Sequence, residues 1–169
     1  GFVLSDGADR LNRVRIQAER LGIQYLTLGE TYRQFIAAAS ASNFNLSLAE
    51  KIFYSVANAG GKLKLTNDQI QGTFLAIEQM ISKGVVSMEE LRRQLGDRLP
   101  GAFALAAKAM GVTEVQLNEM IKSGTVLAVD LLPKLAKELD KQYGNNLSEN
   151  IESLQASVSR LYNTFDVAI

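Results

Sequence analysis

The chain has 169 residues, of which 47% are hydrophobic, and its 18 basic side chains balance its 18 acidic ones. This length and apolar content suit one domain with a buried core, and the neutral charge gives no argument for a nucleic acid or an anionic membrane as a partner. Cysteine and histidine are absent, which excludes disulfides, thiol chemistry, serine–histidine triads and zinc sites of the usual kind.

The start of the chain does not have the layout expected of a signal peptide. It begins Gly1-Phe2, and its first arginines follow the apolar start instead of preceding it. No apolar run reaches the length of a bilayer span, so we expect no membrane span in this fragment. The start without Met indicates a piece cut from a longer parent chain.

Helical periodicity dominates the sequence. In chain order the expected helices are 8–22, 29–42, 47–59, 66–83, 87–95, 99–110, 113–123, 129–143 and 147–166. The short segment 62–65 alternates as a strand does, but it is too short to build a sheet. The sequence therefore predicts an all-α fold, one compact domain over residues 1–169 with about eight or nine helices.

The first and last of these helices carry heptad-like apolar seams. The seams consist of Leu11, Val14, Ala18, Leu21, Tyr25 and Leu28 at one end, and Leu147, Ile151, Leu154, Val158, Leu161 and Phe165 at the other. Each seam either packs on the core of this domain or continues as a coiled coil that leaves it. Gly22 and Gly29 argue against a continuous coil through the first seam.

Helix starts are marked by capping boxes, in which a Ser or Thr is followed three residues later by Glu or Gln. In chain order the boxes are Thr27–Glu30, Ser47–Glu50, Thr66–Gln69, Ser87–Glu90 and Thr113–Gln116. Helix ends are marked by glycines suited to the left-handed C-cap conformation. These are Gly60-Gly61, Gly84, Gly96, Gly111, Gly124 and Gly144, and Pro100 fits the first turn of the helix at 99–110.

Two segments repeat each other at an offset of 40 residues. Thr73, Met80-Ile81, Gly84 and Val86 recur as Thr113, Met120-Ile121, Gly124 and Val126. Further along, Glu90-Leu91 and Leu95 align with Asp130-Leu131 and Leu135. The pattern indicates either a duplicated helical hairpin or chance similarity between helices. In the first case, we expect the links Val85-Val86 and Val126-Leu127 to lie in the core.

Carboxylates leave one enzyme class open, because glycoside cleavage needs only two of them. The candidates are Glu78, Glu89, Glu90, Asp97, Glu114 and Glu119. Glu89 and Glu90 fit a helix first turn and Glu78 fits a solvated face near Lys83, so we expect no catalytic residues. We also expect no cofactor and no metal site.

Three arginines, Arg92, Arg93 and Arg98, cluster beside Asp97 and form a candidate partner surface. The alternative is that they complement a helix dipole, with Asp97 and Arg98 forming a surface pair.

The stretch from Glu78 to Gly111 strongly resembles the N-terminal domain of tape measure proteins of long-tailed phages and prophages. Its most specific residues are Glu89, Glu90, Leu91, Gln94, Leu95, Gly96, Leu99, Pro100, Gly101 and Phe103. The resemblance covers roughly residues 20–165. One departure is Ala128-Val129, where small polar residues would be expected to open the next helix.

The resemblance implies a structural role. Tape measure proteins are long helical chains that set tail length while the tail tube polymerises around them. The implied location is the virion tail, and the host cytoplasm during assembly. The implied partners are tail tube, tail-tip and tail chaperone proteins, with self-association through the terminal helices. The alternatives are a module that binds the chaperone or tip proteins, and a two-carboxylate domain that cleaves peptidoglycan.

Overall fold

The computed structural model describes residues 8–9, 11–16 and 25–144 of the chain. Residues 8–9 and 11–16 are helical, and the elements that follow are α2 (Tyr25–Ala41), α3 (Leu46–Lys62), α4 (Asn67–Lys83), the π-helix η1 (Glu89–Leu95), α5 (Gly96–Arg98), α6 (Ala102–Met110), α7 (Glu114–Lys122) and α8 (Ala128–Tyr143). Over this part of the chain the fold is all-α, as predicted, and the only β-type pairing there is an isolated bridge between Val85 and Leu127.

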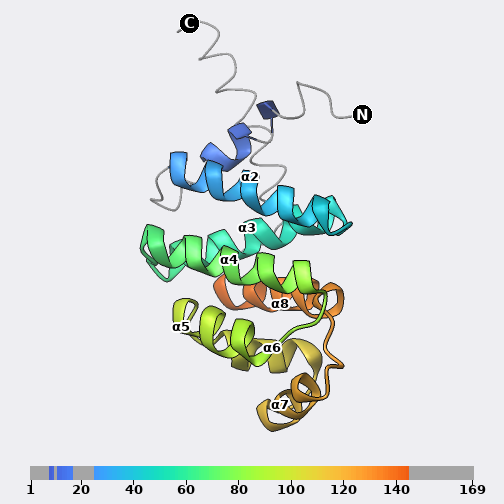
Figure 1. Cartoon of the computed structure of the whole chain (residues 1–169). Helices are drawn as coiled ribbons and strands as arrows, with labels where there is room; N and C mark the ends of the chain where they lie inside the picture. The colour runs from blue at the N-terminus through green and yellow to red at the C-terminus, as the bar shows by residue number, and fades with distance from the viewer. Residues whose placement is uncertain (1–7, 10, 17–24, 145–169) are drawn as a thin grey trace, which may run out of the picture.

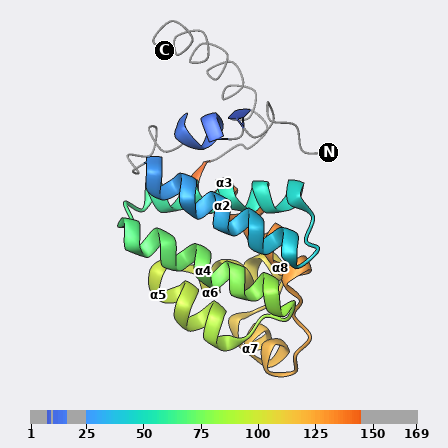
Figure 2. The same ribbon diagram turned by 45° about the horizontal axis from the view of Figure 1, so that its top comes forward.

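The helices stack in successive layers (Figures 1 and 2). Helix α3 packs against α2 and α8, while α4 packs against α2 and η1. At the far end, α6 packs against α8, and α7 packs against α6. No helix in the described ranges combines the length and the apolar character needed to cross a membrane.

Contacts between aromatic rings join α2, α3 and α4. Phe53 of α3 stacks on Phe74 of α4 at a centroid distance of 4.6 Å, and Phe35 of α2 meets Phe74 edge-on at 5.5 Å. All three phenylalanines are fully buried. Tyr32 and Tyr54 extend the cluster by edge contacts with Phe53. Tyr54 lies next to Glu50, and burial, followed by this nearby charge, raises the pKa of its phenol.

Two of the five predicted capping boxes are complete in the structure. Thr66 and Thr113 form complete capping boxes with Gln69 and Gln116, as predicted. Ser87 accepts from the Glu90 amide at 3.4 Å, whereas the Glu90 carboxylate turns away from the box. Two further starts are wrong: α3 is capped by Asn45, so Ser47 lies inside it, and α2 begins before Thr27.

The predicted helix ends are confirmed at four glycines and wrong at one pair. Gly84, Gly111, Gly124 and Gly144 follow helices with positive φ, as predicted. The prediction for Gly60-Gly61 is wrong: α3 continues to Lys62, and the positive φ of 55° falls on Lys64. A Cβ on Gly60 would lie 3.4 Å from Ile70, in ordinary van der Waals contact, so this glycine lies inside α3 and does not end it.

The first seam packs on the core of the domain where it can be followed. Val14 and Leu28 are fully buried, and Arg13 bridges to Glu50 of α3 at 3.4 Å. This agrees with the core-packing alternative for these two positions. Leu11 is half-buried, whereas Ala18, Leu21 and the side chain of Tyr25, together with the whole helix expected at 147–166, lie outside the residues whose placement is described.

Gly84 and Gly29 give a matched pair of alanine substitutions with opposite expected signs. Gly84 has φ +77°, so Gly84→Ala is expected to destabilise the chain by about 1 to 2 kcal/mol. Gly29 lies inside α2 with open space where a Cβ would lie, so Gly29→Ala is expected to stabilise by about 0.5 to 1 kcal/mol. Urea unfolding of both variants tests this, and equal signs would contradict the left-handed cap at Gly84.

Candidate interaction site

The motif segment around η1 contributes mainly to the core. Leu91, Leu95 and Leu99 are all fully buried, and they follow one another at intervals of four residues. In a π-helix each amide bonds to the carbonyl five residues back, which widens the turn and keeps such residues on one face. Gly96 has φ −62°, so it continues the helix into α5, and its predicted role as a helix end is wrong.

The second half of the motif, Leu99-Pro100-Gly101, forms the turn into α6. Leu99 is extended at φ −111° and ψ 96°, as a residue before proline prefers. Gly101 has φ +79° and immediately precedes α6. Pro100 therefore lies in the turn, and the predicted helix 99–110 begins at Ala102. Phe103, the last motif residue, is 9% exposed.

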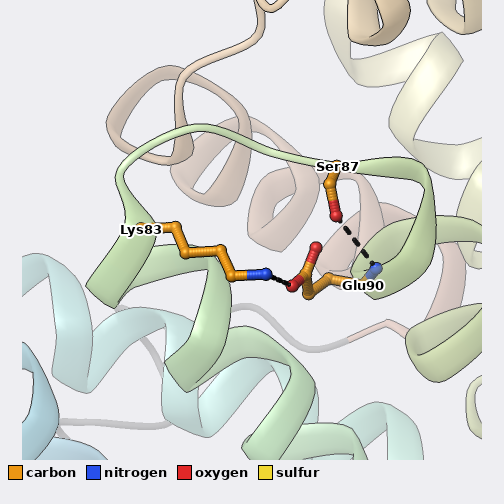
Figure 3. A network of polar contacts seen from close by, with 3 residues as sticks. All are labelled: Lys83, Ser87 and Glu90. Carbon is orange, nitrogen blue, oxygen red and sulfur yellow. Dashed lines mark hydrogen bonds and ion pairs between the residues drawn. The ribbon is translucent and has the colours of Figure 1, made fainter.

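Glu90 is the most buried charged residue in the described structure. Its side chain is 1% exposed, and Oε1 accepts from the Lys83 ammonium at the end of α4. Figure 3 shows Lys83 reaching Glu90 beneath the link that carries Ser87. The second carboxylate oxygen has no hydrogen-bond partner within the described residues. This pair ties η1 to α4 across the link.

A second buried carboxylate, Glu138 on α8, was missed by the sequence analysis. Lys141 donates to it at 3.2 Å, and Lys108 of α6 lies at 3.8 Å from its other oxygen. The i,i+3 spacing of Glu138 and Lys141 was a visible local signal. The cross-helix contact with Lys108 has no sequence signature, because the two lysines come from helices that are distant along the chain.

The three arginines of the candidate partner surface all make contacts within the domain. Arg92 lies over the Phe103 ring at 5.0 Å, and Arg93 pairs with Glu89 at 3.2 Å. Arg98 donates to the Gln94 carbonyl at 2.8 Å. Arg92 and Arg93 are nevertheless exposed, so their outer surfaces are open to a partner.

Arg98 packs against Gly72 of α4. A Cβ on Gly72 would lie 2.0 Å from its Nε, so the arginine occupies the space that a side chain would fill. The expected pair between Asp97 and Arg98 is not among the ion pairs of the described residues. Arg98 therefore connects α5 to α4.

The two links of the repeated pattern pair with each other. The Val86 amide donates to the Val126 carbonyl and the Ala128 amide to the Gly84 carbonyl, both at 2.9 Å. Val86 and Val126 are buried, as predicted, whereas Val85 and Leu127 are about 40% exposed. At the departure, the bridge satisfies one amide of the helix start, because Ala128 is the first residue of α8 and donates to the Gly84 carbonyl.

The repeat itself is only partial. Thr113 caps α7, but its counterpart Thr73 lies in the middle of α4, where its hydroxyl donates to the Gln69 carbonyl. The similarity therefore covers the ends of α4 and α7, the links, and two pairs of buried leucines after the links, Leu91 with Leu131 and Leu95 with Leu135.

A hollow of about 360 Å³ opens between α2 and α4. Its lining consists of Thr31, Gln34, Asp68, Gln71, Gly72, Leu75 and Glu78. Burial of Glu78 raises the pKa of its carboxyl group. Glu78 is half-buried in the wall of this hollow, and Lys83 binds Glu90 and not Glu78.

The other candidate carboxylates are dispersed. Glu89 pairs with Arg93, Asp97 lies on α5, and Glu114 and Glu119 lie on α7. In the part of the chain that the structure describes, no group of three or more acidic side chains is arranged to hold a metal ion.

Comparison with known proteins identifies the family. A family model described as tape measure protein matches residues 4–169. The chain is 34% identical over 158 residues to a "Probable tape measure protein" of Salmonella phage Felix O1. This match covers 90% of the chain but 21% of the relative, so the chain spans about a fifth of that protein. No solved structure matches the chain. The chain belongs to the tape measure protein family.

Proposed function

We propose that this domain is a compact structural module of a tape measure protein in a phage or prophage tail. In this proposal the whole protein sets tail length, and this domain organises assembly of the tail tube. The observation that carries it is the family match over residues 4–169, combined with a folded helical core. Assembly takes place in the host cytoplasm, and the mature location is the virion tail.

The length of the relative and the short helices of this domain favour different roles for different parts of the protein. Since 158 matched residues are 21% of the relative, that protein has about 750 residues. A continuous α-helix of that length would span about 1,100 Å at 1.5 Å per residue. In contrast, the longest described helix has 17 residues and folds back on its neighbours. A compact domain adds little to a ruler, so it suits an organising role.

Deletions in the phage that encodes this chain test this division. Removing 100 helical residues of the parent protein outside this domain is expected to shorten the tail by about 150 Å. Removing residues 25–144 is expected to leave few assembled tails, as counted by electron microscopy. A normal number of tails shortened by about 180 Å, the helical length of those residues, would contradict the proposed organising role.

The second candidate function is binding of a tail chaperone or tail-tip protein. The exposed side chains of Val85 and Leu127 favour it, because the bridge holds this apolar pair on one outward face. The exposed Arg92 and Arg93 are the second candidate surface. Co-purification with candidate tail proteins, compared for the chain and for Val85→Ser and Arg93→Glu variants, distinguishes the two surfaces.

A further inference from the structure

The outward row of α4 is acidic at both ends. Asp68, Gln71, Leu75 and Glu78 follow one another at intervals of three or four residues and all line the hollow. Neither carboxylate forms an ion pair or hydrogen bond within the described residues. Leu75 lies between them and is 53% exposed. Arg98 packs against Gly72, but it donates to the Gln94 carbonyl and is not part of the lining.

The outward row of α8 has the opposite charge. Asp130, Lys134, Lys137 and Lys141 also follow one another at intervals of three or four residues, and all four are exposed. Lys141 binds Glu138, whereas Lys134 and Lys137 form no ion pair within the described part of the chain. Both rows therefore present charge that the domain itself does not neutralise.

We propose that the hollow between α2 and α4 binds the lysine row of α8 from a second copy of this chain. The two surfaces lie on different helices, so the contact joins unlike faces. Such a contact leaves one hollow and one lysine row free at the ends of a dimer, and it can add further copies. The self-association expected from the terminal helices is a separate contact and is not needed for this one.

The charges on the two rows favour one relative orientation of the two helices. Asp68 and Glu78 are ten residues apart, or about 15 Å along the helix, and Lys134 and Lys141 are seven apart, or about 10 Å. The long lysine stems bridge the difference. An antiparallel contact brings Lys141 to Asp68 and Lys134 to Glu78.

The same orientation satisfies the remaining members of both rows. It lays the methylene stem of Lys137 towards Leu75, so that apolar surface is covered on both sides. It also directs Asp130 towards the Lys83 end of α4. In the parallel orientation with Lys141 at Glu78, Asp130 would lie beside Asp68, because they are eleven and ten residues earlier in their helices, so like charges oppose this arrangement.

Sedimentation equilibrium of the 169-residue chain at low and high salt tests the proposal. We expect concentration-dependent association that weakens as salt screens the ion pairs. Glu78→Lys disables the hollow, and Lys137→Glu disables the lysine row. Each change is expected to weaken association about tenfold or more. Glu78→Lys keeps the lysine row, and Lys137→Glu keeps the hollow. An equimolar mixture of the two variants is therefore expected to form a heterodimer and to recover pairwise association that each variant alone has lost.

Controls separate this contact from general charge effects. Asp68→Lys, at an exposed position, repeats the Glu78 test without altering a half-buried residue. Glu114→Lys and Lys122→Glu on α7 reverse charges elsewhere and are expected to leave association unchanged. A chain that stays monomeric at every concentration overturns the proposal, as does equal sensitivity to the α7 variants. A monomeric chain whose hollow binds a lysine-rich peptide also overturns the assignment of a second copy.

Discussion

Phe53→Ala is expected to lower the free energy of unfolding by about 4 kcal/mol, which is a large part of the stability of a domain this size. Phe53 is fully buried and contacts four other rings, which come from α2, α3 and α4. Its removal costs the transfer free energy of the ring and leaves a cavity that three separate helices would have to close. Urea unfolding at 25 °C measures the loss as a lower midpoint with an unchanged slope.

Two further variants show whether the loss comes from this packing. Phe53→Leu keeps most of the apolar volume and is expected to cost about 1 to 2 kcal/mol. Val115→Ala truncates a side chain on α7 that is 74% exposed, and it is expected to change stability by no more than about 0.5 kcal/mol. A cost for Phe53→Ala close to that of Val115→Ala would mean that the aromatic cluster does not hold α2, α3 and α4 together.

The sequence predicted those features whose causes are local. The Thr66 and Thr113 boxes are complete within four residues, and the left-handed glycines Gly84 and Gly111 directly follow their helices. The same local rules failed at Gly60, which lies inside α3 two residues before its last residue, Lys62. A glycine inside a helix and a glycine in a left-handed turn look the same in a sequence.

Features that depend on the fold were predicted least well. The leucines of η1 repeat every four residues, a spacing that also fits an α-helix, so the π-helix had no distinct signal. The bridge between Val85 and Leu127 joins links that are separated in sequence by η1, α5, α6 and α7. Glu90 had every local mark of a first-turn capping residue, but Lys83, seven residues earlier, faces it across the link and binds its carboxylate. The hollow also required the fold, since α2 and α4 are not consecutive.

The Lys83–Glu90 pair is expected to be strongly asymmetric when its members are removed singly. Lys83→Met leaves a carboxylate that is 1% exposed without its counter-charge. Breaking a fully buried pair costs about 3 to 5 kcal/mol, and because the Lys83 side chain is 59% exposed we expect about 2 to 3 kcal/mol here. Glu90→Leu leaves only a lysine that water can reach, so its expected cost is below about 1 kcal/mol.

The double variant Lys83→Met/Glu90→Leu tests whether the cost of Lys83→Met comes from the unpaired charge of Glu90. We expect its stability to return to within about 1 kcal/mol of the original chain, because the buried charge and its partner are removed together.

Lys141→Met is the matched control: it also removes a lysine from a buried carboxylate, but Lys108 remains 3.8 Å from Glu138. It should therefore cost less than Lys83→Met in the same urea titration. If Lys83→Met and Lys141→Met cost the same, or if the double variant is as unstable as Lys83→Met alone, then Lys83 stabilises the domain through something other than the Glu90 charge. The asymmetry follows from geometry, because a single lysine serves Glu90 across the link, whereas two lysines from different helices serve Glu138.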